Sequence, residues 1–124
     1  MDEEQFRQLV EQAVAAIGEE FVNKLDNVQI VIEDEPSSQQ RRDNHLGPED
    51  SLLGLYEGVP LTEREDYTLV LPDKITIFKR VIEEMADDVA EVKQLVYDTV
   101  WHEIGHHFGL DEAEVRRRER RAGD

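Results

Sequence analysis

The sequence contains no cysteine, which excludes disulfide bonds and thiolate metal ligands. Aromatic residues make up only 6% of the 124 residues, and no apolar run is long enough for a transmembrane helix. Basic residues are also few, because 14 Lys and Arg stand against 30 Asp and Glu, for a formal net charge of −16. Such a charge repels phosphate groups and anionic lipids, so we expect neither a nucleic acid nor a membrane as a partner.

Length and composition predict one folded domain over residues 1–124, since 39% of the residues are hydrophobic and 35% are charged. The first residues lack a basic region followed by an apolar core, so we expect no signal peptide and a cytoplasmic location. The oligomeric state does not follow from the sequence.

Apolar spacing predicts an opening helix between Phe6 and Leu25. A β-branched run predicts a strand over Val28–Ile32, and the Pro- and Gly-containing segment 34–50 is expected to be a loop. The sequence also predicts three later strands, within Leu52–Leu61, Tyr67–Leu71 and Ile75–Phe78. The predicted order is a helix, then strands, then helices, and this order indicates an α+β fold with a small sheet.

A short helix is expected to begin between Phe78 and Glu84, and a long amphipathic helix to span Asp88–Phe108. Asp87 and Asp88 are both candidates for the N-cap of the long helix. Residues 113–124 are expected to form a charged C-terminal helix or tail, whose Arg-rich run suits the negative end of a helix.

The long helix carries the motif H-E-x-x-H at residues 102–106. Residues four apart lie on the same face of a helix, so His102 and His106 can both bind one Zn²⁺ ion. Glu103 projects at a neighbouring angle, where it can act as the general base that takes a proton from a metal-bound water. His107 points elsewhere and is interpreted as structural or solvent-facing.

A catalytic zinc takes three protein ligands, and the chain is expected to turn back at Gly109. Glu112 is the favoured third ligand, with Asp111 as the alternative, because both acids follow that turn. A site of two histidines and one carboxylate can also hold other divalent metals.

The chain resembles the small bacterial zincin-like metallopeptidase domains, or minimal zincins. The resemblance lies in HEIGHHFGLDE at 102–112, LLGLYEGVPLTER at 52–64, LPDKITIFKR at 71–80 and VQIVIEDEP at 28–36. That family's pattern, HExxHxxGxxD, implies His102, His106 and Glu112 as ligands and Glu103 as the base. Glu112 departs from the Asp of the pattern.

The resemblance further implies a small mixed sheet with an N-terminal helix and a C-terminal active-site helix. Zincins bind extended peptides along an edge strand of the sheet, and the strand near 52–60 is the candidate for that edge, with an interior packing strand as an equal alternative. Three further residues are substrate or supporting candidates. Asp98 could orient the imidazole of His102, Tyr56 could contact substrate or stabilise an oxyanion, and His45 could approach from its loop. Solvated positions for Asp98 and His45 and core packing for Tyr56 are the alternatives.

The sequence therefore predicts a zinc-dependent metallopeptidase that hydrolyses a peptide or protein substrate. The alternative is a non-catalytic scaffold module that binds a metal or a peptide. Glu103 favours the enzyme, since a structural metal site has no need of a base.

Overall fold

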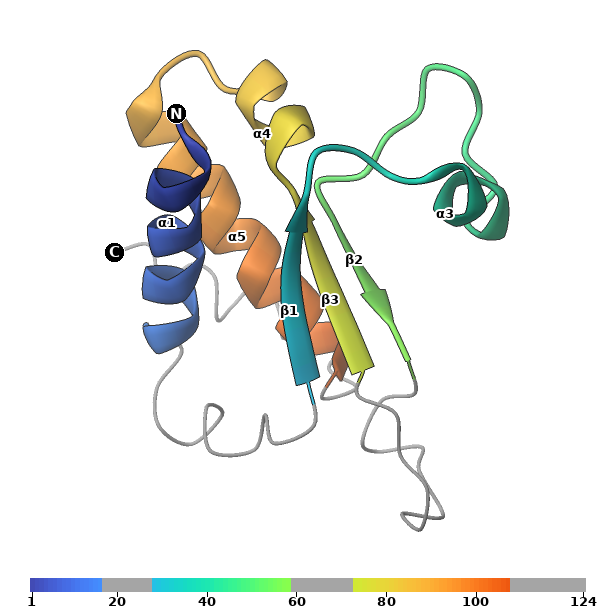
Figure 1. Ribbon diagram of the computed structural model, residues 1–124, viewed down its shortest axis with the longest axis horizontal. Coiled ribbons are helices and arrows are strands. Elements are labelled where there is room, and N and C mark those ends of the chain that lie inside the picture. Colours follow the sequence, from blue (N-terminus) through green and yellow to red (C-terminus); the bar gives the residue numbers. More distant parts are fainter. Residues whose placement is uncertain (17–27, 59–72, 108–124) are drawn as a thin grey trace, which may run out of the picture.

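Four helices and three strands make up the described part of the chain (Figure 1). The computed structural model describes residues 1–16, 28–58 and 73–107, and only the backbone of His107. In chain order, the elements are α1 (Glu3–Ala15), β1 (Val28–Glu33), α3 (Ser38–Asp43), β2 (Gly54–Glu57), β3 (Asp73–Phe78), α4 (Lys79–Met85) and α5 (Val89–His107).

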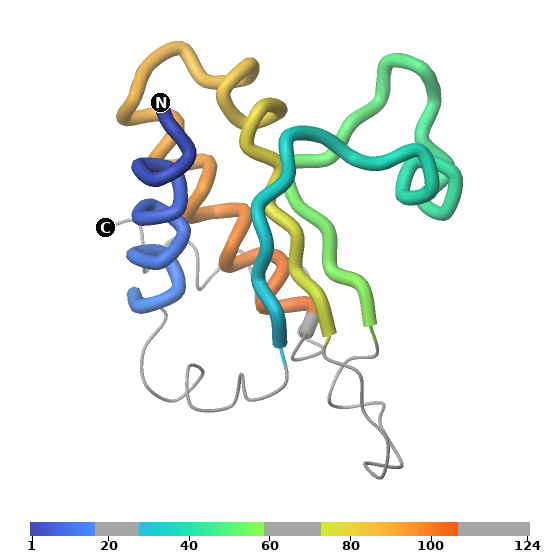
Figure 2. Tube along the Cα trace, viewed as in Figure 1, coloured from blue at the N-terminus to red at the C-terminus, as the bar shows by residue number. Residues whose placement is uncertain are grey.

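The three strands form one mixed sheet in the order β1-β3-β2. β1 lies parallel to β3, although the two strands are far apart in the sequence, and β2 lies antiparallel to β3 (Figure 2). The register places Ile30 and Tyr56 on either side of Ile75. This arrangement confirms the expected α+β fold with a small mixed sheet, and makes β2 an edge strand among the described strands.

The core lies between the sheet and two helices, because α5 packs across β2 and β3 and α1 packs against α5 (Figure 1). Side chains alternate between the two faces of a strand, so Ile75 and Ile77 point to the same side. The buried apolar core consists of Phe6, Val10, Ala13, Ile75, Ile77, Ile82, Val92, Val96, Val100, Trp101 and Ile104. The helical spacing seen in the sequence thus corresponds to the buried faces of α1 and α5.

Segment 34–50, predicted to be a loop, contains the helix α3. The helix begins with a capping box: Gln40 N–H donates to Oγ of Ser37 at 3.1 Å, and Ser37 N–H donates to Oε1 of Gln40 at 2.9 Å. The Gln40 amide also donates to Oε1 of Glu57 at 2.9 Å, which ties α3 to β2. The loop prediction was wrong here because it weighed proline and glycine and overlooked the capping pair.

Other expected elements are found within shorter bounds. The strand expected in Leu52–Leu61 is described over Gly54–Glu57, and the short helix after Phe78 is α4. The opening helix is described to Ala15, and its expected continuation to Leu25 lies outside the described residues. The strand at Tyr67–Leu71 and the tail 113–124 also lie outside them. None of the described helices is long and apolar enough to cross a membrane.

Candidate metal centre

Helix α5 carries the motif residues on its last described turns, and its start is fixed by a side-chain cap. Oδ1 of Asp88 accepts a hydrogen bond from the backbone N–H of Glu91 at 2.8 Å. This bond satisfies one of the amide groups that the first turn of a helix leaves without a partner. Of the two aspartates considered as caps, Asp88 is therefore the one in contact with the first turn.

Three motif side chains lie close together near the end of α5. One ligand atom each from His102, Glu103 and His106 lies within 4.8 Å of the other two. The two imidazole rings have centroids 4.7 Å apart, and Nδ1 of His106 is 3.7 Å from Oε1 of Glu103. Nitrogen and carboxylate oxygen are the donor types that zinc prefers, so this group fits a divalent cation.

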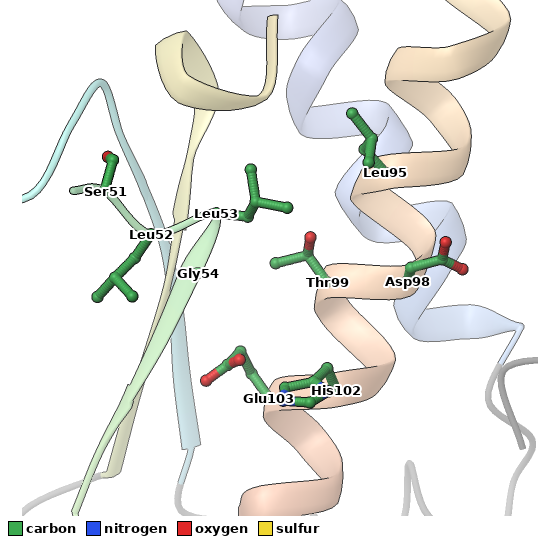
Figure 3. A pocket seen from close by; sticks show the side chains of 9 residues that line it. All are labelled: Ser51, Leu52, Leu53, Gly54, Leu95, Asp98, Thr99, His102 and Glu103. Atoms are coloured by element: carbon green, nitrogen blue, oxygen red, sulfur yellow. The ribbon is translucent and has the colours of Figure 1, made fainter. Parts of the chain in front are cut away.

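Glu103 is the buried member of the group, with 7% of the residue exposed, whereas His102 is half-buried and His106 is exposed. Figure 3 shows the Glu103 side chain in the space between α5 and β2. A carboxylate in such a place interacts more strongly with a neighbouring charge than one in open solvent.

The absence of a side chain at Gly54 allows β2 to approach the helix at this point. A β-carbon there would lie 2.6 Å from Cγ2 of Thr99 and 3.2 Å from Cγ of Glu103. Real β-carbons essentially never come as close as 2.6 Å, so a larger residue would push the strand and the helix apart. Gly54 thus keeps the covering strand directly over Glu103.

A pocket of about 370 Å³ opens beside the donor group, between α5 and the segment that leads into β2 (Figure 3). We call it the α5–β2 pocket. Its lining comprises Ser51, Leu52, Leu53, Gly54, Leu95, Asp98, Thr99, His102 and Glu103. Since His102 and Glu103 belong to both, the pocket and the donor group are continuous.

A model of the zincin-like metallopeptidase family matches residues 25–122, which is 98 of the 124 residues. The chain belongs to the zincin-like metallopeptidase family. No curated protein matches the chain. The match covers β1 to α5 and therefore contains the whole donor group of this zincin-like domain.

In this zincin-like domain, Tyr56 packs against the core as well as making a polar contact. It is half-buried among the residues that cover the core cluster, and its hydroxyl donates a hydrogen bond to Oδ2 of Asp73. Asp73 is itself buried, and a β-carbon at Gly58 would collide with its carboxylate. Tyr56 belongs neither to the donor group nor to the lining of the α5–β2 pocket.

The other two supporting candidates lie in different places. Asp98 lines the pocket together with His102, and its Oδ1 accepts a hydrogen bond from the Gln94 amide at 2.8 Å. His45 is exposed in a left-handed backbone conformation, with φ of 56°, just after α3. It is part of neither the donor group nor the pocket lining.

The proposed third ligand, Glu112, and its alternative, Asp111, lie outside the described residues, as does the side chain of His107. Sequence reasoning did not single out Gly54, Thr99 or the leucines as site residues. Leu95 and Thr99 could have been predicted to lie near the site, since they precede His102 by seven and three residues and so share its face of the helix.

Proposed function

We propose that the protein is a metal-dependent peptidase that hydrolyses peptide bonds. The observation that carries this proposal is the position of Glu103, which is buried beside two imidazoles whose rings lie 4.7 Å apart. Membership of the zincin-like metallopeptidase family supports it. A purely structural metal site would have no use for a carboxylate at that place.

In this proposal, His102 and His106 hold the metal, which is Zn²⁺ or another divalent ion, with Glu112 as the third ligand and Asp111 as the alternative. When bound, such an ion acts as a Lewis acid that polarises a carbonyl group. The half-buried His102 is held against the wall of the pocket, while His106 offers its ring from the exposed side.

Glu103 is the general base in this proposal. Its carboxylate takes a proton from the attacking water and then passes the proton to the nitrogen of the leaving amine. Oε1 of Glu103 lies 3.7 Å from Nδ1 of His106, so the carboxylate is already beside the ligand group. The covering strand at Gly54 keeps it there.

We further propose that the substrate is an extended peptide that pairs with the edge strand β2. Leu53 accepts a hydrogen bond from Phe78 N–H at 2.9 Å, which marks these two residues as a hydrogen-bonded pair of the antiparallel ladder. Such pairs alternate along a ladder, so the peptide N–H and C=O of the next residue, Gly54, point away from β3. A peptide strand placed there would run past Glu103.

The test is the variant Glu103→Gln, which keeps the size of the side chain and removes the base. We expect the variant to retain its metal by elemental analysis and to lose about 100-fold to 10,000-fold in cleavage rate on a peptide library. Glu84→Gln is the matched control, because Glu84 is exposed on α4 and lies outside the site.

Cleavage by purified Glu103→Gln at the parent rate would show that the proposed base is wrong. A wild-type protein that binds zinc and cleaves nothing in the library would favour the scaffold module instead.

A further inference from the structure

The α5–β2 pocket has apolar walls, although it adjoins a polar donor group (Figure 3). Leu52 and Leu53 contribute from the segment before β2, and Leu95 contributes from α5. All three are half-buried. Figure 3 shows the side chain of Leu53 directed toward α5, which carries Leu95, whereas the side chain of Leu52 points away from α5. A volume of about 370 Å³ lies at the low end of the range for ligand sites, which is about 300–1,000 Å³. One large side chain with some adjoining backbone fits that space.

The charges around the pocket are of one sign. Asp98 and Glu103 contribute carboxylates, and the described lining residues include no Lys or Arg. An acidic side chain entering the pocket would therefore meet two carboxylates, and the described lining would offer it neither Lys nor Arg as a partner. The net charge of −16 acts in the same direction.

A basic side chain would meet the same carboxylates, and that of Asp98 is already hydrogen-bonded within α5. Oδ1 of Asp98 accepts a hydrogen bond from the Gln94 amide at 2.8 Å, along the surface of α5. A cation would share the Asp98 carboxylate with Gln94 and would leave its own water shell beside Leu53 and Leu95. The walls thus favour an uncharged side chain over a basic one.

We propose that the α5–β2 pocket binds one large apolar side chain of a substrate peptide, such as leucine or phenylalanine, and rejects acidic side chains. This substrate class rests on the peptidase function proposed above. The continuity of the pocket with His102 and Glu103 places the bound side chain beside the bond to be cleaved.

The experiment measures binding without catalysis. The full ¹⁵N-labelled chain is kept metal-free with EDTA and titrated with blocked tetrapeptides that carry leucine, phenylalanine, lysine or aspartate at one position. We expect the leucine and phenylalanine peptides to bind at least about tenfold more tightly than the aspartate peptide. The amide signals of Leu52, Gly54 and Thr99 should shift during the titration. Equal binding of leucine and aspartate, or tightest binding of lysine, would overturn the proposal.

A charge reversal tests the acidic rim separately. Asp98→Lys should improve binding of the aspartate peptide about fivefold or more, because a repulsive neighbour becomes attractive. Glu84→Lys is the matched control, since it changes the net charge equally from an exposed position outside the pocket. Asp98→Asn gives the same direction with a smaller gain should the lysine variant not fold. An identical response of the Asp98 variants and the control would overturn the proposal.

The two proposals fail in distinguishable ways. A protein that prefers leucine peptides in EDTA but never cleaves them after zinc is added would refute the peptidase alone. Zinc-dependent cleavage with no preference among the four peptides would refute the pocket alone.

Discussion

Glu103 is the residue at which helix and sheet meet in this molecule. It belongs to α5, yet its Cγ would be 3.2 Å from a β-carbon at Gly54 on β2. Thr99, one turn earlier, is closer still, at 2.6 Å from the same position. The fit of the strand over the helix is therefore decided by a few atoms, and a single methyl group can test it.

Gly54→Ala should destabilise the protein by about 1–3 kcal/mol, measured by urea unfolding, because the new methyl group overpacks a tight contact. Thr99 has a stiff, β-branched side chain and cannot swing away easily. Gly47→Ala is the matched control, since its β-carbon would meet only the end of the Asp50 side chain, at 3.1 Å. Both changes reduce the entropy of the unfolded chain similarly, so the difference between them isolates the contact.

The double variant Gly54→Ala with Thr99→Ser removes the Cγ2 atom that the new methyl group strikes. We expect it to recover a measurable part of the lost stability, which a double-mutant cycle quantifies. If Gly54→Ala proves as stable as Gly47→Ala, the strand does not lie as close to the helix as described.

The sequence predicted the group of His102, Glu103 and His106, since helical spacing alone sets their separation. It could not predict the contact of Gly54 with Thr99 and Glu103, because that depends on how far β2 is shifted along α5. Nor could it pair Tyr56 with Asp73, which lie 17 residues apart and meet only through the register of β2 with β3.

At the scale of elements, α5 shows how periodicity and capping act together. The helix expected over Asp88–Phe108 is described as Val89–His107. It could be predicted because its apolar positions repeat every three or four residues. The much shorter α3 has six residues and no long pattern of this kind, so only its capping box marks it. Long amphipathic elements are predictable from sequence, whereas short ones depend on local hydrogen bonds.

Asp88→Ala should lower the free energy of unfolding by about 1 kcal/mol, because the Glu91 amide loses its acceptor. Asp87→Ala is the neighbouring control and should stay within about 0.5 kcal/mol of the parent. Asp88→Asn should retain most of the stability, since its side-chain oxygen can accept the same bond. Equal losses for both alanine variants would show that charge near the helix start matters, and not the cap.

For the molecule as a whole, the strongly acidic composition is a competing explanation for any effect of a divalent cation. A net charge of −16 attracts cations to the surface without a specific site and weakens the folded state through self-repulsion. Screening by any divalent ion would relieve that repulsion equally. A specific centre must instead distinguish between metals and depend on its ligands.

Zinc added to chelator-treated protein should raise the melting temperature by about 10 °C at a free concentration near 100 times its dissociation constant. Unfolding can be followed through Trp101, the single tryptophan, which is buried beside His102 in the sequence. Calcium, which prefers oxygen ligands, should give a much smaller shift. His106→Ala should lose the response to zinc, because it removes one of the two imidazoles from the donor group. An equal shift with calcium, or an undiminished shift in His106→Ala, would assign the effect to the acidic surface and not to a metal centre on α5.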